Sequence, residues 1–348
     1  MADGGVRRRP RQASMADVGR MAEVSAQTVS RFFNNGYVSE DARQRISEAV
    51  EELGYRQNKL PRSLRLSRTD SIGYLNVGPI NHGSGSILTG LSRAARAAGQ
   101  ALLTTQLDLD PHAPDKAEDV RHALETFLSL RVDGIIVGTP YSGLNTVVET
   151  IGKAVPLVAL SDQVASQLSS VQADSHAAAC LAVEHLVALG HRRILHLAGP
   201  SITNEASERV RGFRDTMARH GLDAAEPIYC DAWTARAGYA AADALDPSEF
   251  TAVFAGNDLL ALGLMSRLHS QGLLCPRDYS VIGIDDSPED AFYTPALSSV
   301  WIDFEQMGEM ACRLLLGHIA EPHPALRLHT TTQLRVRDST AAPSRAMP

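Results

Sequence analysis

One short segment carries side chains whose types and spacing suit hydrogen bonding to a nucleic acid. If residues 26–33 form a helix that buries Val29 and Phe33, the polar side chains between them share the outer face. These side chains are Gln27, Thr28, Ser30 and Arg31. Gln can pair with two positions on adenine, Arg can pair with two on guanine, and hydroxyl groups can bond to phosphate. A solvated polar face on a small helical bundle would have the same residue types, so both interpretations remain open here.

Three short helices are predicted over residues 14–58 to position this face. Ser14 begins a capping-box pattern, Ser25 is placed to cap the second helix, and Ser39 is placed to cap the third. Gly54 follows the third helix, as is typical of a helix end. Two short helices joined by a tight turn, with a third helix behind them, indicate a helix-turn-helix.

The charge distribution favours a polyanionic partner for this region. Residues 1–68 hold 13 arginine and lysine residues against 8 aspartate and glutamate residues, whereas the rest of the chain holds 20 against 32. The formal net charge of −7 therefore hides a small basic segment attached to a large acidic body. A basic segment of this kind is attracted to polyanions.

From residue 71 onward, short apolar runs alternate with helical patterns. The expected strands are Ile72–Val77, Ala101–Gln106, Gly134–Val137, Leu157–Leu160, Ile194–Ala198, Val253–Ala255 and Val281–Ile284. The expected helices are Ser86–Ala98, Lys116–Leu130, Ala177–Leu189, Ser207–His220, Ala235–Leu245, Leu259–Ser270 and Phe304–Ile319. This alternation predicts an α/β fold with doubly wound parallel sheets, whose ligands bind beyond the carboxyl ends of the strands. Since the units are many for one sheet, we expect two lobes with a cleft between them.

The segment Met15–Arg31 resembles the N-terminal signature of the lactose-repressor/galactose-repressor (LacI/GalR) family. The elements D-V, A-x-V-S-x-x-T-V-S-R, N, V-S, R and L-G-Y-x-x-N stand in order through Asn58. Glu23 departs from the glycine that is usual in the turn. Further landmarks of the family are Val183–His191, Leu197–Pro200, Arg209–Phe213, Gly256–Asp258, Val281–Asp286 and Tyr293–Leu297. The resemblance covers residues 14–340 and implies a DNA-binding regulator whose body has the fold of periplasmic sugar-binding proteins.

The resemblance also implies which residues contact DNA. Base edges would be contacted by Ala26, Gln27 and Arg31, and phosphates by Ser25, Thr28, Ser30 and Asn34. Leu64 falls in a hinge segment that in this family becomes a helix on operator DNA and wedges leucines into the minor groove. Pro61 departs from the small residue usual there, but a proline is tolerated in the first turn of a helix.

The effector-binding residues implied by the resemblance are Ser161, Asp162, Arg209, Trp233, Asn257, Asp285 and Phe304. Carboxylates accept bonds from hydroxyl groups, Arg and Asn donate them, and an indole ring covers apolar C–H groups, so the set fits a sugar. Structural alternatives remain open: Asn257 could cap a helix, Trp233 could belong to the core, and Asp285 could form a turn. Ser161 stands where an acidic ligand is expected, and Ile302 where a polar residue can occur, so the sugar stays unidentified.

The expected domain boundaries follow from these patterns. They are a basic tail (1–13), the helix-turn-helix (14–58), a hinge or linker (59–69), an effector-binding domain (70–340) and a second tail (341–348). Within the effector-binding domain we expect an N-lobe of about 70–171 and 301–329 and a C-lobe of about 172–300 and 330–340.

We therefore expect a homodimeric, sequence-specific transcriptional regulator, a repressor that a small sugar-type effector releases from a palindromic operator. The alternative is a corepressor-dependent regulator that responds to a purine, nucleoside or phosphorylated metabolite. A cytoplasmic location, at the nucleoid when DNA is bound, follows from the missing export signal, which also disfavours an exported sugar receptor. No catalytic motif such as G-x-S-x-G, H-E-x-x-H or a P-loop occurs, so we expect no enzyme, no cofactor and no metal. The chain ends without a leucine heptad tail, which favours a dimer over a tetramer.

Overall fold

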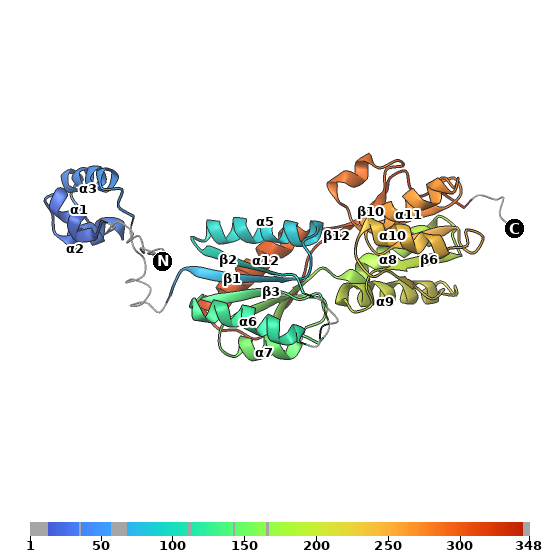
Figure 1. Ribbon diagram of the computed structural model, residues 1–348, viewed down its shortest axis with the longest axis horizontal. Helices are drawn as coiled ribbons and strands as arrows, with labels where there is room; N and C mark the ends of the chain where they lie inside the picture. Colours follow the sequence, from blue (N-terminus) through green and yellow to red (C-terminus); the bar gives the residue numbers. More distant parts are fainter. Residues whose placement is uncertain are drawn as a thin grey trace, which may run out of the picture. The chain divides into compact units, whose positions relative to one another are not determined.

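The computed structural model describes residues 13–34, 36–56, 68–109, 113, 115–141, 143–164 and 167–343. They belong to two compact units, Met1–Thr69 and Asp70–Pro348, and each unit is described by itself (Figure 1). The expected hinge residue Leu64 lies outside the described residues. Over the described part of the chain, no helix is long and apolar enough to cross a membrane.

The N-terminal unit contains the three predicted helices, α1 (Met15–Met21), α2 (Ala26–Phe33) and α3 (Glu40–Glu52). Two caps are confirmed: Ser14 forms a capping box before α1, and Ser25 Oγ accepts a bond from the Thr28 amide at 3.1 Å. Ser39 precedes α3 as predicted, but its side chain makes no capping bond. These local bonds fix where α1 and α2 begin.

The three helices share one small apolar core. Its most buried members are Val18, Ala22, Val29 and Ile46. Phe33 was expected to be buried but is only half-buried, because it lies at the end of α2 against the rings of Phe32 and Tyr55. Burial of Val29 fixes the orientation of α2 and leaves the opposite face of this helix to solvent.

The first sheet of the second unit has the strand order β11-β5-β4-β3-β1-β2, and all its neighbouring strands are parallel. Its strands are β1 (Ser71–Val77), β2 (Ala101–Leu107), β3 (Gly134–Gly138), β4 (Leu157–Leu160), β5 (Ser169–Gln172) and β11 (Arg327–His329). One face is covered by α5 (His82–Ala97) and α12 (Phe304–Ala320), the other by α6 (Lys116–Ser129) and α7 (Asn145–Gly152) (Figure 1). Alternate residues of β1 enter the two cores, since successive side chains of a strand point to opposite faces.

The second sheet has the order β12-β10-β9-β8-β6-β7. Its strands are β6 (Ile194–Ala198), β7 (Ile228–Tyr229), β8 (Ala252–Ala255), β9 (Ser280–Asp285), β10 (Ser298–Ile302) and β12 (Thr332–Arg335). One face is covered by α8 (Ser175–Ala188) and α9 (Asn204–Arg219), the other by α10 (Ala235–Ala241) and α11 (Asp258–Ser270). The sheet is parallel except for β12, which runs antiparallel to β10. The expected strict alternation of strands and helices therefore fails at this edge, and also between β4 and β5, which no helix separates.

The chain passes between the two sheets three times, after β5, after β10 and after β11. Backbone bonds join these crossings: the Thr330 amide donates to the Gln172 carbonyl at 2.9 Å, and the Asp303 amide to the Thr331 carbonyl at 3.0 Å. β10 continues in the second sheet to Ile302, close to the lobe boundary expected at about residue 301. The three joined crossings form a narrow connection on one side of the interlobe space.

Candidate functional site

The exposed face of α2 carries two long polar side chains, Gln27 and Arg31. Gln27 and Arg31 are exposed, and neither has a hydrogen bond or ion pair among the described residues. Ala26 is exposed beside them at the start of the helix. Gln27 and Arg31 are thus free to bond to groups on another molecule, as the sequence predicted for this face.

The other four residues predicted to contact DNA form local hydrogen bonds at α2; they are Ser25, Thr28, Ser30 and Asn34. Ser25 Oγ lies 2.9 Å from Thr28 Oγ1, and Asn34 Nδ2 donates to the Ser30 carbonyl at 2.7 Å. These bonds secure both ends of the helix and hold the four polar side chains at its termini. Their hydroxyl and amide groups remain at the surface beside Gln27 and Arg31.

Glu23 occupies a strained place in the turn between α1 and α2. Its φ is 53°, in the left-handed region that side chains other than glycine adopt at a cost. Close packing surrounds this turn: a Cβ atom on Gly19 would lie 2.8 Å from the Val24 carbonyl oxygen. The departure from glycine noted in the sequence therefore lies where the backbone favours glycine.

Replacing Glu23 with glycine should stabilise the N-terminal unit by about 1 kcal/mol, because glycine adopts this φ without steric cost. Amide hydrogen exchange of α1 and α2 in the full-length protein should slow about fivefold. Glu23→Ala is the matched control, since it removes the charge but keeps the Cβ atom. Equal slowing in both variants would show that charge, not backbone strain, is the cause.

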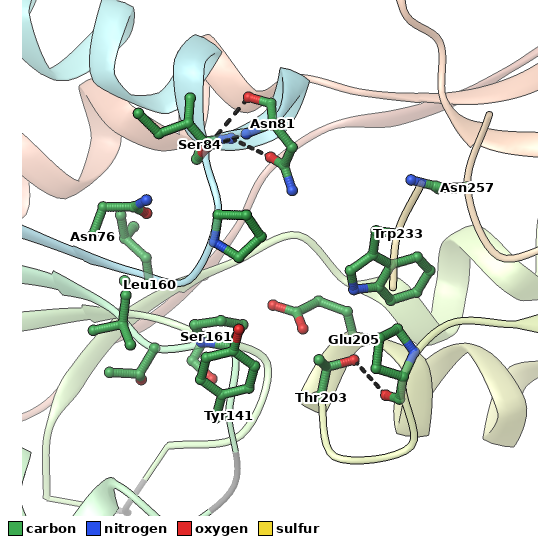
Figure 2. A pocket seen from close by; sticks show the side chains of 18 of the residues that line it. Asn76, Asn81, Ser84, Tyr141, Leu160, Ser161, Thr203, Glu205, Trp233 and Asn257 are labelled. Atoms are coloured by element: carbon green, nitrogen blue, oxygen red, sulfur yellow. Dashed lines mark hydrogen bonds between the residues drawn. The ribbon is translucent and has the colours of Figure 1, made fainter. Parts of the chain in front are cut away.

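A cavity of about 450 Å³ lies between the two sheets of the second unit, beyond the carboxyl ends of β1, β3, β4 and β9. All seven residues predicted to bind an effector line it: Ser161, Asp162, Arg209, Trp233, Asn257, Asp285 and Phe304. Figure 2 shows Asn76 and Ser161 of the first lobe facing Trp233 and Asn257 of the second. The volume is large enough for a small metabolite.

Arg209 connects three groups of the cavity wall. Its side chain is 6% exposed; Nη1 donates to the Gly256 carbonyl, and Nη2 lies 3.6 Å from Asp285 Oδ1. The guanidinium also lies over the Trp233 ring, 5.1 Å from its centroid. Burial raises the pKa of Asp285 to about 6, although the positive charge of Arg209 opposes this rise. The Asp285 carboxylate can accept hydrogen bonds from a ligand in the cavity.

The structural alternatives for Asn257 and Trp233 also hold, whereas Asp285 lies in a strand and not in a turn. Asn257 Oδ1 accepts a bond from the Leu260 amide at 2.9 Å and caps α11. Trp233 packs so closely on Gly199 that a Cβ atom there would lie 2.1 Å from the indole. Asp285 is the last residue of β9 and has a φ of 119°. Each residue is thus fixed by a structural contact and still lines the cavity.

Ser161 and Asp162 are engaged in contacts that join the lobes. Ser161 Oγ accepts a bond from Asn204 Nδ2 of α9 at 3.0 Å. The Asp162 carboxylate accepts bonds from the Ala173 and Ser175 amides at 3.2 and 3.3 Å, at the first crossing. Burial raises the pKa of Asp162, and the bonds from Ser175 oppose the rise. Asp162 therefore supports the crossing with both of its carboxylate oxygens.

Phe304 begins α12 immediately after the second crossing and forms an apolar part of the wall. Its ring lies against Gly83, where an added Cβ atom would approach it to 3.2 Å, and meets His82 edge-on at 6.2 Å between centroids. It supplies an aromatic surface on the first lobe, as Trp233 does on the second.

Glu205 is a cavity residue that the sequence analysis missed. It lies in the first turn of α9, and its Oε2 atom is buried without a hydrogen-bond partner among the described residues. Burial, together with the negative charge of Asp162, raises the pKa of Glu205 to about 7. One signal was present in the sequence: Glu205 precedes Arg209 by four residues, so the two side chains share a helix face.

Glu205 should make the ligand-free protein less stable as the pH rises. The folded state binds the proton of Glu205 more tightly than the unfolded state, so this contribution is lost between pH 4.5, its ordinary pKa, and about pH 7. The free energy of unfolding should fall by roughly 3 kcal/mol over this pH range. Glu205→Gln should be about as stable as wild type at pH 5 and more stable at pH 8 in urea unfolding. A difference between the two proteins that does not change with pH would contradict this assignment.

The histidines near β6 are held by structural contacts. His196 is buried, its ring is stacked on Phe254 at 4.3 Å between centroids, and burial lowers its pKa to about 4. His191 and His185 bond to groups near the C-terminal end, the Ala341 carbonyl and the Thr340 hydroxyl. A search of the described ranges finds no group of three His, Cys, Asp or Glu side chains placed to hold a metal.

Comparison with known proteins agrees with both units. The family of bacterial regulatory proteins, lacI family, matches residues 14–58, and the periplasmic binding protein-like domain matches residues 183–340. The HTH-type transcriptional regulator AscG of Escherichia coli (strain K12) is 32% identical over 345 residues, which cover 95% of this chain and 99% of the relative. A structure of the Lac repressor dimer bound to operator and the anti-inducer ONPF superposes with a TM-score of 0.85 at 27% identity, covering 95% of this chain and 100% of that chain. A complex of the transcriptional regulator CelR with cellobiose gives a TM-score of 0.70 at 28% identity, covering 94% and 99%.

Proposed function

The chain belongs to the lacI family of bacterial regulatory proteins, and from this membership we propose how its two sites act together. It is a DNA-binding transcriptional repressor regulated by a small-molecule effector. One observation carries the proposal: a single chain combines an exposed α2 face, with Gln27 and Arg31 unpaired among the described residues, and a polar cavity between two α/β lobes.

We propose that α2 lies in the major groove and that Gln27 and Arg31 contact base edges. Gln pairs with adenine and Arg with guanine in a bidentate geometry, which requires side chains that are exposed and otherwise unpaired. Ser25, Thr28, Ser30 and Asn34 then contact phosphates, because their polar groups lie at the two ends of the same helix. Ala26 has only a methyl group and can contact a thymine methyl. Leu64 of the hinge is assigned to the minor groove by the family resemblance alone.

The protein acts as a homodimer, as the Lac repressor does in its operator complex. One helix-turn-helix offers too few contacts for tight binding, whereas two copies bind the half-sites of a pseudo-palindrome. We propose that an effector in the cavity draws the lobes together and changes the spacing of the two DNA-binding units. An effector that prefers this closed state weakens operator binding by its difference in affinity for the two states.

We propose a carbohydrate as the effector class. The cavity combines aromatic surfaces on both lobes, Trp233 and Phe304, with hydrogen-bonding groups such as Asn257 and Asp285, and this mixture suits the C–H and O–H faces of a sugar. The cellobiose complex of CelR is a structural neighbour with a sugar. A corepressor of the purine or nucleoside type is the second hypothesis, and the sign of its effect on operator binding would distinguish it.

The DNA-binding part is tested by selecting duplexes from a randomised pool with the purified full-length protein. We expect enrichment of a two-fold symmetric sequence, and the affinity for it should fall steeply as salt rises, because phosphate contacts release counterions. Thermal shift measurements with monosaccharides, disaccharides, nucleosides and purines test the effector part. Failure to enrich any duplex would overturn the proposed function.

A further inference from the structure

The cavity wall is strongly acidic. Among the described residues that line it, five carry carboxyl groups, Asp108, Asp162, Glu205, Asp231 and Asp285, against one cationic side chain, Arg209. Asp108 and Asp231 are exposed, while the other three residues are half-buried and burial raises the pKa of their carboxyl groups. A ligand with a phosphate or carboxylate would meet repulsion from those of the five groups that are ionised.

Arg209, the one cation among the described lining residues, is held by contacts within the protein. The Arg209 guanidinium contacts the Gly256 carbonyl, the Asp285 carboxylate and the Trp233 ring at once. Its side chain is only 6% exposed, and its Nε atom is buried without a hydrogen-bond partner among the described residues. The nearby Asp285 carboxylate offsets part of the positive charge that an anionic ligand would meet.

Glu205 is the group that a ligand could satisfy. Its Oε2 atom is buried and has no partner within the part of the chain that the structure describes. Figure 2 shows the Glu205 carboxylate extending into the space between Tyr141 and Trp233. An unpaired buried carboxylate is costly, and the cost falls most when the partner is a positively charged donor.

We propose that the natural effector carries a basic nitrogen on a sugar-like, hydroxyl-rich skeleton, and that this nitrogen binds the Glu205 carboxylate. The inference rests on the proposed function and narrows its effector class. The ammonium group satisfies the Oε2 atom of Glu205. The other carboxyl groups of the wall, where ionised, disfavour phosphorylated and carboxylated sugars. The aromatic rings of Trp233, Tyr141 and Phe304 accommodate the uncharged part of the molecule.

Matched sugars test the proposal by calorimetry and thermal shift with the full-length protein at pH 7. The panel pairs glucose, galactose and mannose with their 2-amino derivatives and with a pyranose that has nitrogen in the ring, and adds glucose 6-phosphate. We expect at least one basic member to bind at least tenfold more tightly than its neutral parent, and the phosphate not to bind. Glu205→Gln should abolish this preference, whereas Asp215→Asn, which removes a carboxylate from the outer side of the same helix, should keep it.

Three outcomes overturn the proposal: no basic sugar binds, the neutral parent binds as well as its amine, or the preference survives in Glu205→Gln. Operator binding separates this failure from failure of the proposed function. If a neutral sugar or nucleoside binds and changes operator affinity, the proposed function is supported, and only the proposal of a basic nitrogen on the effector is wrong. If the protein binds no operator, the proposed function falls first.

Discussion

Arg31→Ala should lower operator affinity by about 100-fold or more and remove base preference at one position of each half-site. A bidentate Arg–guanine contact contributes about 1–3 kcal/mol of discrimination, and a dimer loses two such contacts. Loss of fold is not expected, because the Arg31 side chain is exposed and has no partner among the described residues. Fluorescence anisotropy with the selected duplex, and with duplexes substituted at each position, measures both effects.

Arg31→Lys is the matched control for this effect. Lysine keeps the positive charge and its attraction to phosphate, but it lacks the planar fork that pairs with guanine. We expect this variant to keep most non-specific affinity and its salt dependence while losing the base preference. If Arg31→Ala discriminates between bases as well as wild type does, α2 is not the helix that reads the operator.

Asp285→Asn should leave operator binding without effector unchanged and reduce effector affinity by about two orders of magnitude. Asparagine is chosen because it tolerates the positive φ of 119° better than alanine does. The amide cannot accept hydrogen bonds from sugar hydroxyls with both of its polar atoms, and it no longer forms an ion pair with Arg209. A charged-to-neutral change at a site with several bonds accounts for a loss of this size.

The readout is operator release as a function of effector concentration, with the operator affinity of the effector-free variant as an internal check on folding. Asp231→Asn is the control, because Asp231 also lines the cavity but is exposed to solvent. That variant should respond nearly as wild type does. If Asp285→Asn releases operator at the same effector concentrations as wild type, Asp285 does not belong to the effector site.

The N-terminal unit could be predicted in detail because its signals are local. Ser14 and Ser25 cap helices through bonds to amides three residues away, and such bonds depend little on the rest of the fold. The backbone conformation of the turn at Glu23 could not be predicted in this way. Sequence comparison marked the residue as unusual, but only the backbone shows that it has a left-handed φ.

In the second unit, the predicted strands include the edge strand β2, and the missed strands are β5, β7, β10, β11 and β12. Central strands such as β1, β3 and β8 are continuous apolar runs buried on both faces. The missed edge strands are short or partly exposed: β7 has two residues, and β12 alternates between half-buried and exposed positions. Such segments have no strong apolar pattern, and their pairing depends on tertiary contacts.

The cavity illustrates the same division between local and tertiary information. Family positions identified seven residues that the fold brings to one cavity, yet they could not show that the Asp162 carboxylate bonds to two backbone amides. Glu205 was missed because a glutamate in the first turn of a helix is ordinarily an exposed residue that favours the helix dipole. Its burial follows only from the packing of the two lobes around the start of α9.

Occupation of the cavity should control operator affinity, and a reciprocal titration measures this coupling. The operator dissociation constant is measured with and without saturating effector, and the effector dissociation constant with and without saturating operator. Linkage requires the same factor in both directions, and we expect a factor of about 5–150. A factor of one in both titrations, with an effector that demonstrably binds, would show that the cavity does not control operator binding.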